Sequence, residues 1–270
     1  MLIQGADSAC GLARESKGER IYVREATPVE RRDQDVSSRG QMLKQVGEIV
    51  EHERLWLVFQ PVASMRGDTN ERYEVLLRLR NAEGQDLVPG SVFGVVHNHS
   101  LGLALDRWVI DHALEMLRQR QLTTTLFIKV LPVTLQDRTL SGWLRERLEQ
   151  TGVEAQRIVF SVAEAAIERG LRDMFAFLGG IKLLGCGFCL DRFGRGADSL
   201  GLLKNLGADY VKLDMYFVNN LARDSKKQAQ LKELVQNLEA LGAATIVGGV
   251  EDVQAMPILW SLGIDLIQGF

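Results

Sequence analysis

The stretch from Cys189 to Gly196 carries the residues whose types and order are best suited to chemistry. An apolar run ends in Asp191 and Arg192 and continues into a turn that contains glycine. This pattern predicts a buried strand followed by a loop, with Asp191 at the carboxyl end of the strand, where α/β folds build their sites. A carboxylate directly followed by a guanidinium is the first indication of the chemistry there.

Charged, polar or glycine residues stand at or near the carboxyl ends of all the predicted strands after the first. In chain order, the residues at these strand ends are Glu74, Arg78, Lys129, Ser161, Glu164, Asp191, Arg192, Lys212, Asp214, Gly248, Gly249, Glu251 and Gln268. The carboxyl ends of the strands of an α/β barrel converge on one mouth. We therefore expect two carboxylates, Glu74 and Asp191, to lie close to three cations. These are Lys129, Arg192 and Lys212.

This balance of charge favours binding of phosphate over metal-dependent cleavage. Mg²⁺ requires several oxygen ligands, chiefly carboxylates, whereas ammonium or guanidinium groups repel a divalent ion and neutralise the carboxylates. The same cations contact phosphate directly, and Arg does so through two hydrogen bonds. The sequence thus predicts a site that holds a phosphate compound without a divalent metal.

Alternating helix and strand patterns position these residues from Gln41 onward. Strand patterns are centred on Phe59, Leu76, Ile128, Val159, Leu190, Lys212, Ile246 and Ile267. The helix patterns between them include Pro132 to Leu148 and Ala163 to Leu178. Eight such strands with intervening helices predict an α/β fold, a modified (β/α)8 TIM-like barrel. The first two strands are joined by a polar loop, Asp68-Thr69-Asn70, without a helix, so we expect one strand, the first, to be antiparallel to the others.

Residues 1–38 differ in composition from the barrel and are too short to form a core. They contain a short helical pattern, a brief strand pattern at Arg20 to Val23, and a charged run from Glu30 to Asp35 that we interpret as a linker. We therefore divide the chain into the carboxyl-terminal remnant of another domain plus linker at 1–38 and a barrel domain at 39–270.

Composition excludes several classes of protein. Lys and Arg total 32 against 35 Asp and Glu, a formal charge of -3, which argues against nucleic acid as the main partner. No apolar run reaches the roughly 18 residues of a membrane span, and the amino terminus lacks a secretory signal pattern, so we expect a cytoplasmic protein without membrane insertion.

Two other groups of reactive side chains are interpreted as structural. Cys186 and Cys189 have the spacing of a redox pair but lie in a predicted strand, whereas thioredoxin-type pairs begin a helix. The histidines have no set of carboxylates beside them and are expected to be surface groups rather than metal ligands; they are His52, His97, His99 and His112.

Several ordered motifs from about Leu43 to the end resemble the EAL domain family, which hydrolyses cyclic di-GMP. The matching segments are Phe59-Gln60-Pro61-Val62, Glu74-Val75-Leu76-Leu77-Arg78, Asp191-Arg192-Phe193-Gly194-Arg195-Gly196, Tyr210-Val211-Lys212-Leu213-Asp214, Gly248-Gly249-Val250-Glu251 and Gln268-Gly269-Phe270. The resemblance implies a modified (β/α)8 barrel with one antiparallel strand. Residues Ala6 to Tyr22 resemble the last helix and strand of a GGDEF domain.

Departures from the family pattern imply a degenerate domain. Glu74 and Asp191 stand where active members have metal ligands, but the other metal positions are occupied by Lys129, Ser161, Arg192 and Gly248. Lys212 is retained, yet it has no metal-bound water to assist. We therefore expect no catalytic residues, no divalent metal cofactor, and hydrolysis that is absent or very slow, so that the chain is not an enzyme.

The resemblance assigns ligand binding to a different set of residues. The expected contacts to cyclic di-GMP are Gln60, Glu74, Leu76, Leu77, Arg78, Asp106, Asp191, Arg192, Lys212, Gly249, Glu251, Gln268, Gly269 and Phe270. Arg78 is expected on a phosphate. Asp106 or Glu251 is expected to accept from guanine, whose N1 and N2 donors suit a carboxylate.

The chain also resembles degenerate EAL domains of the FimX type, which share the Glu-Val-Leu signature and the lost loop Asp. They bind cyclic di-GMP and recruit a PilZ-domain adaptor that controls type IV pili and twitching motility. The resemblance thus implies a bacterial receptor domain that signals through a PilZ-domain partner. A homodimer is left open.

Alternatives remain at single residues and for the whole domain. Asp191 is either a ligand residue or a helix N-cap, and Arg192 either contacts phosphate or is solvated. Lys129 contacts phosphate or forms an ion pair with Glu74 or Asp191, which also excludes metal. The alternative functions are a weak metal-dependent cyclic di-GMP phosphodiesterase and an interaction module that binds no nucleotide.

Overall fold

The computed structural model describes residues 28–120, 124–168, 170–250 and 254–269. Its first described element is helix α2 (Pro28–Glu51), and the compact unit that contains the barrel begins at Val46. The charged run from Glu30 to Asp35 is helical rather than irregular, because Pro28 suits the first helical position and Glu, Arg and Gln are good helix formers. The predicted GGDEF remnant at Ala6 to Tyr22 lies outside the described residues.

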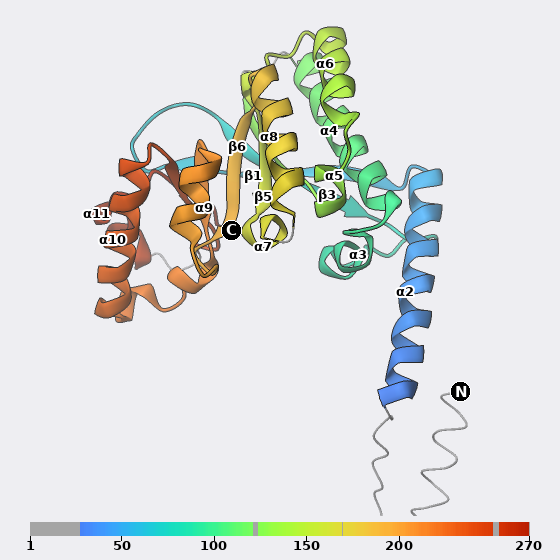
Figure 1. The fold of residues 1–270 in the computed structure, drawn as a ribbon, viewed down its shortest axis with the longest axis horizontal. Coiled ribbons are helices and arrows are strands. Elements are labelled where there is room, and N and C mark those ends of the chain that lie inside the picture. The colour runs from blue at the N-terminus through green and yellow to red at the C-terminus, as the bar shows by residue number, and fades with distance from the viewer. Residues whose placement is uncertain (1–27, 121–123, 169, 251–253, 270) are drawn as a thin grey trace, which may run out of the picture. The chain divides into compact units, whose positions relative to one another are not determined.

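The described strands form a nearly closed barrel of nine strands (Figure 1). They are β1 (Leu55–Pro61), β2 (Ala63–Ser64), β3 (Arg72–Leu79), β4 (Thr125–Lys129), β5 (Ile158–Ala163), β6 (Gly187–Phe193), β7 (Tyr210–Leu213), β8 (Ala244–Val247) and β9 (Leu266–Ile267). From β3 to β9 each strand pairs in parallel with the next, whereas β1 is antiparallel to β3. The prediction of a modified α/β barrel with an antiparallel first strand is therefore confirmed.

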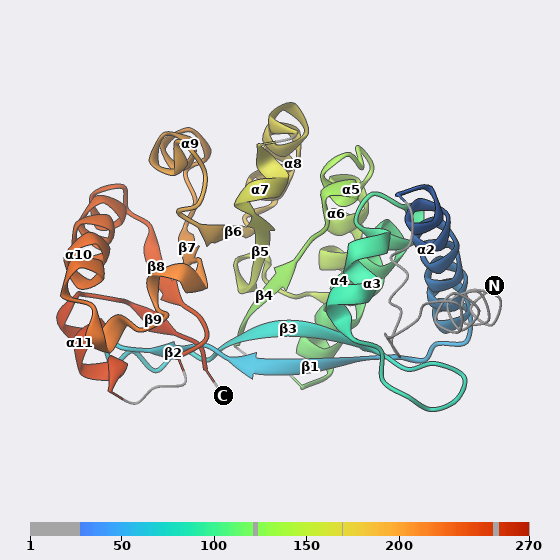
Figure 2. The same cartoon turned by 90° about the horizontal axis from the view of Figure 1, so that it is seen from below.

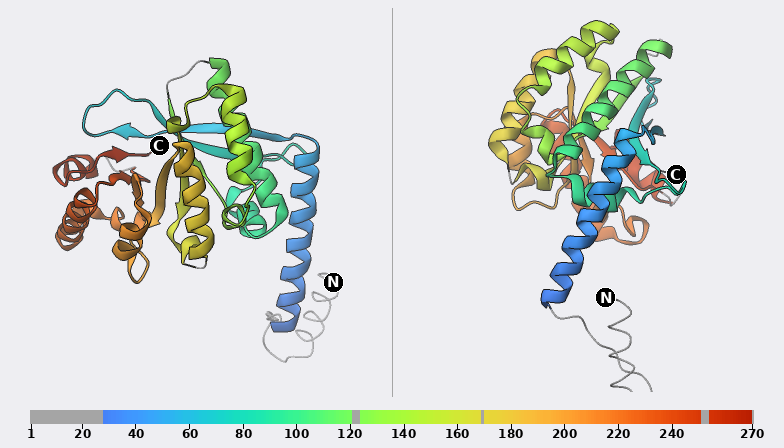
Figure 3. Two further views of the ribbon diagram at one scale, coloured as in Figure 1. Left: turned by 45° about the horizontal axis from the view of Figure 1, so that its top comes forward. Right: turned by 90° about the vertical axis from the view of Figure 1, so that its right-hand side faces the viewer.

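Helices cover the outside of the strands. They are α3 (Pro89–Val96), α4 (Ser100–Arg120), α5 (Pro132–Leu135), α6 (Leu140–Thr151), α7 (Glu164–Ile167), α8 (Leu171–Leu184), α9 (Ser199–Leu206), α10 (Ser225–Ala240) and α11 (Ala255–Ser261). Helices α4, α6 and α8 pack side by side (Figure 3), while β1 and β3 run together as an antiparallel pair (Figure 2). None of the helices in the described ranges is long and apolar enough to cross a membrane.

Two long helices predicted from the sequence are each divided in the structure. The helix predicted from Pro132 to Leu148 becomes α5 and α6, because Asp137 accepts hydrogen bonds from the backbone and side chain of Thr139 and forms an intervening turn. The helix predicted from Ala163 to Leu178 becomes α7 and α8, separated near Gly170. Strand β2 and helix α3 were not predicted.

Apolar strand residues fill the barrel and surround its few polar side chains. The central cluster consists of Val62, Phe127, Val159, Cys189, Ile246 and Leu266. Cys186 and Cys189 are buried free thiols, and burial raises the pKa of each to about 12, so both are poor thiolates, in keeping with a structural role. The polar side chains buried beside this cluster include Glu74, Ser161, Asp191 and Gln268.

Candidate functional site

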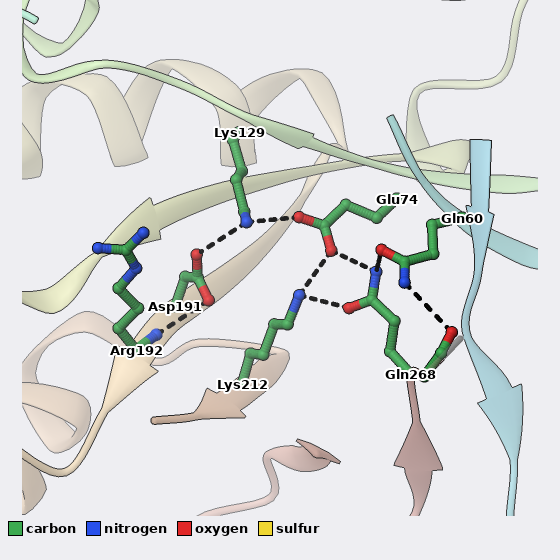
Figure 4. Close-up of polar contacts among 8 residues, drawn as sticks. Gln60, Glu74, Lys129, Asp191, Arg192, Lys212 and Gln268 are labelled. Atoms are coloured by element: carbon green, nitrogen blue, oxygen red, sulfur yellow. Dashed lines mark hydrogen bonds and ion pairs between the residues drawn. The ribbon is translucent and has the colours of Figure 1, made fainter. Parts of the chain in front are cut away.

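Glu74 on β3 is the centre of a polar network inside the barrel (Figure 4). Its Oε1 forms an ion pair with Lys129 Nζ at 2.6 Å, and its Oε2 accepts from Lys212 Nζ at 2.5 Å and from Gln268 Nε2 at 2.6 Å. Burial alone would raise the pKa of Glu74, but the Lys129 and Lys212 ammonium groups lower it to about 2. Glu74 is therefore a carboxylate with both oxygens engaged.

Gln268 and Gln60 extend this network toward the antiparallel strand. Gln268 Oε1 accepts from Lys212 Nζ at 2.5 Å, and Gln268 Nε2 also donates to Gln60 Oε1 at 2.9 Å. Gln60 Nε2 in turn donates to the Gly269 carbonyl at 3.2 Å. Gly248 leaves room for Lys212, because a Cβ there would lie 3.1 Å from Lys212 Cε. Five residues predicted for ligand contact thus bond mainly to one another.

Lys129 on β4 connects this network to the loop after β6. Its Nζ lies 3.5 Å from Asp191 Oδ2 as well as 2.6 Å from Glu74 Oε1. Burial would lower the pKa of Lys129, but Asp191 and Glu74 outweigh that effect and raise it, so the side chain is an ammonium group. Of the two alternatives for Lys129, phosphate contact or an ion pair, the structure shows the ion pair. Lys129 forms it with both Glu74 and Asp191.

At the positions where the resemblance implies metal ligands, the residues of this chain do not fit a divalent cation. The Lys129 ammonium lies between Glu74 and Asp191, where it would repel such an ion. Ser161, the neighbour of Lys129 on β5, and Gly248 add no charged ligand. Within the described part of the chain, no three His, Cys, Asp or Glu side chains gather closely enough to hold a metal.

A cavity of about 610 Å³ lies beside the network and is within the usual size range of ligand pockets. The predicted site residues among its lining are Leu76, Leu77, Arg78, Asp106, Lys129, Ser161, Asp191 and Arg192. Phe93 and His97 also line it and were not predicted as site residues. They were missed because helix α3, which brings them to the cavity wall, was not predicted.

Asp106 on α4 is a buried carboxyl group at this cavity. Its Oδ2 accepts from the Leu131 backbone N–H at 2.7 Å and from Thr134 Oγ1 at 2.5 Å, whereas its Oδ1 accepts no hydrogen bond from the residues that the structure describes. Burial raises the pKa of Asp106 to about 7, despite these two hydrogen bonds. One oxygen is therefore fixed and the other is available to a ligand.

Glu164 holds the loop that follows β6. It is the buried first residue of α7, and its Oε2 accepts from the backbone N–H groups of Gly194, Arg195 and Gly196 at 2.9, 3.2 and 3.3 Å. A Cβ on Gly196 would lie 2.8 Å from Glu164 Oε1, which explains the glycine. The sequence indicates only that Glu164 stands at a strand end, because the three donors that it contacts lie about thirty residues further along the chain.

Gly249 and Asp214 do not line this cavity. Gly249, with φ +70°, lies against Met215 and lines a separate cavity of about 360 Å³. Asp214 accepts from the Tyr216 backbone N–H at 2.9 Å and so caps the 3₁₀ turn Met215–Phe217. Glu251 and Phe270 lie outside the described residues.

The fold and the strand-end motifs place the chain in a known family. The sequence profile of the EAL domain matches residues 43–270, and the chain belongs to this family. The chain is also similar to the FimX EAL domain of Pseudomonas aeruginosa in a crystal structure with bound c-di-GMP. The two are 32% identical, the match covers 84% of this chain and 93% of the other, and the TM-score is 0.80.

Two curated relatives correct one prediction made from the sequence. Cyclic di-GMP phosphodiesterase PdeF of Escherichia coli K12 is 26% identical over 87% of this chain, and cyclic di-GMP phosphodiesterase PdeB of Shewanella oneidensis is 27% identical over 100% of it. The chain spans about a third of the length of each, 32%. The prediction that the chain is not an enzyme is overturned by these relatives, which are named as enzymes.

Proposed function

We propose that this chain binds cyclic di-GMP in the cavity beside Glu74. The similar FimX EAL domain with bound c-di-GMP carries this proposal. The chemistry of the cavity supports it: the Arg78 guanidinium donates only to the Leu77 carbonyl among the described residues and suits a phosphate, while Asp106 Oδ1 suits the N1 and N2 donors of guanine. Leu76 and Phe93 provide apolar surface for the bases.

Isothermal titration calorimetry with cyclic di-GMP tests this function through Arg78→Ala. We expect this variant to bind about 30-fold more weakly, because a charge-assisted hydrogen-bond pair to phosphate contributes about 2 kcal/mol. Arg80→Ala is the matched control, since Arg80 lies two residues further on and pairs with Asp86 at 2.7 Å. Equal affinity of the two variants would place the ligand elsewhere.

Binding without a divalent cation is part of the same proposal. Lys129 and Lys212 already supply positive charge to Glu74, and Lys129 supplies it to Asp191. A ligand with negative phosphates therefore meets carboxylates that are neutralised by the chain itself.

Hydrolysis of cyclic di-GMP is a second candidate function, favoured by the names of the relatives PdeF and PdeB. A turnover assay that separates cyclic di-GMP from its linear product, run with Mg²⁺, with Mn²⁺ and with EDTA, tests it. Linear product that forms with either metal and not with EDTA would assign this activity to the chain. An unchanged substrate in all three would reject it.

The partner that we propose is a PilZ-domain adaptor acting on type IV pili. The likeness to the FimX EAL domain supports this step. Size-exclusion chromatography of the chain with a purified PilZ-domain protein, with and without cyclic di-GMP, tests it. A shared peak that requires the nucleotide is expected, and separate peaks under both conditions would reject the partner. Light scattering on the same column measures whether the chain dimerises.

A further inference from the structure

Some cations around the cavity form ion pairs with carboxylates of the chain, and others do not. Lys212 pairs with Glu74, and Lys129 pairs with both Glu74 and Asp191. Arg78 and Arg192 also line the cavity, but neither guanidinium forms an ion pair with a carboxylate in the described part of the chain. Two guanidinium groups therefore remain for a ligand after the acidic side chains have been neutralised.

The backbone at Arg192 explains why this side chain does not pair with Asp191 beside it. The pairing of β6 with β7 shifts between Leu190 and Phe193, so Asp191 and Arg192 form a bulge. Arg192 has φ +54°, a left-handed conformation that arginine rarely adopts, and its N–H donates to Asp191 Oδ1 at 2.9 Å. Bulges of this kind redirect a side chain next to a site.

The neighbouring contacts hold this geometry in place. Glu164 accepts from the backbone N–H groups of Gly194, Arg195 and Gly196, and Gly194 has φ +98° with Phe217 packed where a Cβ would be. Lys129 satisfies Asp191 Oδ2 from the other side. Figure 4 shows the Arg192 guanidinium directed away from Glu74, with no contact drawn to it. Arg192 is thus an exposed cation on a rigid turn.

We propose that Arg192 binds one phosphate of the cyclic dinucleotide while Arg78 binds the other, an inference that rests on the proposed function. Arg78 belongs to β3 and Arg192 to β6, and three strand spacings separate them, about 14 Å along the sheet. Both side chains line the same cavity, so together they bracket a compact ligand with two phosphates. Each planar guanidinium matches two phosphate oxygens.

Calorimetric titration of cyclic di-GMP into the whole chain and its variants tests this proposal. Arg192→Asn removes the charge but keeps a residue type that tolerates a left-handed backbone, and it is expected to weaken binding about tenfold. Arg192→Lys keeps the charge but lacks the planar guanidinium. Its affinity for cyclic di-GMP should lie between that of Arg192→Asn and that of the wild type. Melting temperatures check that each variant is folded, and Arg192→Lys carries the test if Arg192→Asn does not fold.

Arg195→Asn is the matched control on the same loop. The Arg195 side chain is 65% exposed, lies 3.5 Å from Asp214 Oδ1 and stacks over Tyr216, away from the residues that line the cavity. We expect its affinity to stay within about twofold of the wild type. Raising the salt concentration should also weaken binding less in Arg192→Asn than in the wild type, because one screened ion pair is missing.

The outcomes separate this inference from the proposed function. If Arg78→Ala weakens binding while Arg192→Asn and Arg192→Lys both match the wild type, the Arg192 role is overturned and the proposed function stands. If the wild-type chain does not bind cyclic di-GMP, both fail. A tenfold loss in Arg192→Asn with an unchanged salt dependence would indicate a change of loop structure and would also overturn the phosphate role.

Discussion

The polar network inside the barrel and the cavity beside it use their charges differently. Inside, Glu74, Lys212 and Gln268 bond to one another, and Lys129 closes the network at Asp191. At the cavity, Arg78 and Asp106 each keep hydrogen-bonding capacity that no described residue uses. The difference indicates that the inner charges hold the barrel together, whereas the cavity residues serve a ligand.

Lys129→Met should give the largest effect on stability. It tests whether the polar network inside the barrel stabilises the fold. Glu74 and Asp191 are 3% and 5% exposed and would lose a shared cation, so we expect the free energy of unfolding to fall by about 2 kcal/mol, a value reduced for the half-exposed lysine. Urea unfolding followed by circular dichroism measures it. Lys232→Met, an exposed site on α10, is the control, and equal stability of the two variants would contradict a structural role.

The affinity for cyclic di-GMP measured over a range of pH tests whether Asp106 at the cavity contacts the ligand. Its pKa is raised to about 7, so the fraction that is ionised, and able to accept from two guanine donors, increases with pH. We expect the affinity for cyclic di-GMP to increase up to about tenfold between pH 6 and pH 8.

Asp106→Asn should bind more weakly and lose this pH dependence. His97 also lines the cavity, so His97→Gln is measured in the same series to separate the two groups. An affinity that stays constant with pH in the wild type, or a pH dependence that survives in Asp106→Asn, would show that Asp106 is not the titrating acceptor.

Chelation should give the smallest effect. Because lysines already neutralise Glu74 and Asp191, replacing Mg²⁺ by EDTA is expected to change the affinity for cyclic di-GMP by less than about twofold. Calorimetry in the two buffers measures this. A marked loss of affinity in EDTA would mean that a divalent ion takes part in binding despite the ammonium of Lys129.

The sequence could predict the strands because their signal is local. Alternating and continuous apolar patterns gave a centre that lies inside each of β3 to β9, and the polar loop before Arg72 indicated the antiparallel β1. Helix α3 was missed because Pro89 to Val96 is short and almost wholly apolar, which gives no helical periodicity. Phe93 and His97 were missed as lining residues for the same reason.

The candidate site was predictable as far as it depends on strand ends. Glu74, Lys129 and Asp191 were expected to lie close together and do so. The hydrogen bonds from the loop after β6 to Glu164, and the bulge at Arg192, depend on contacts between segments that are distant in the sequence. No local sequence pattern encodes such contacts. The prediction of inactivity rested on substituted positions alone, and the phosphodiesterase relatives overturn it.

Calorimetric titration of the wild-type chain with cyclic di-GMP in EDTA most directly tests the claim that the cavity is a nucleotide site. We expect one dinucleotide per chain with a dissociation constant in the micromolar range or tighter, that is about -8 kcal/mol or more favourable. No binding heat and no rise in melting temperature at about 100 μM ligand would contradict it.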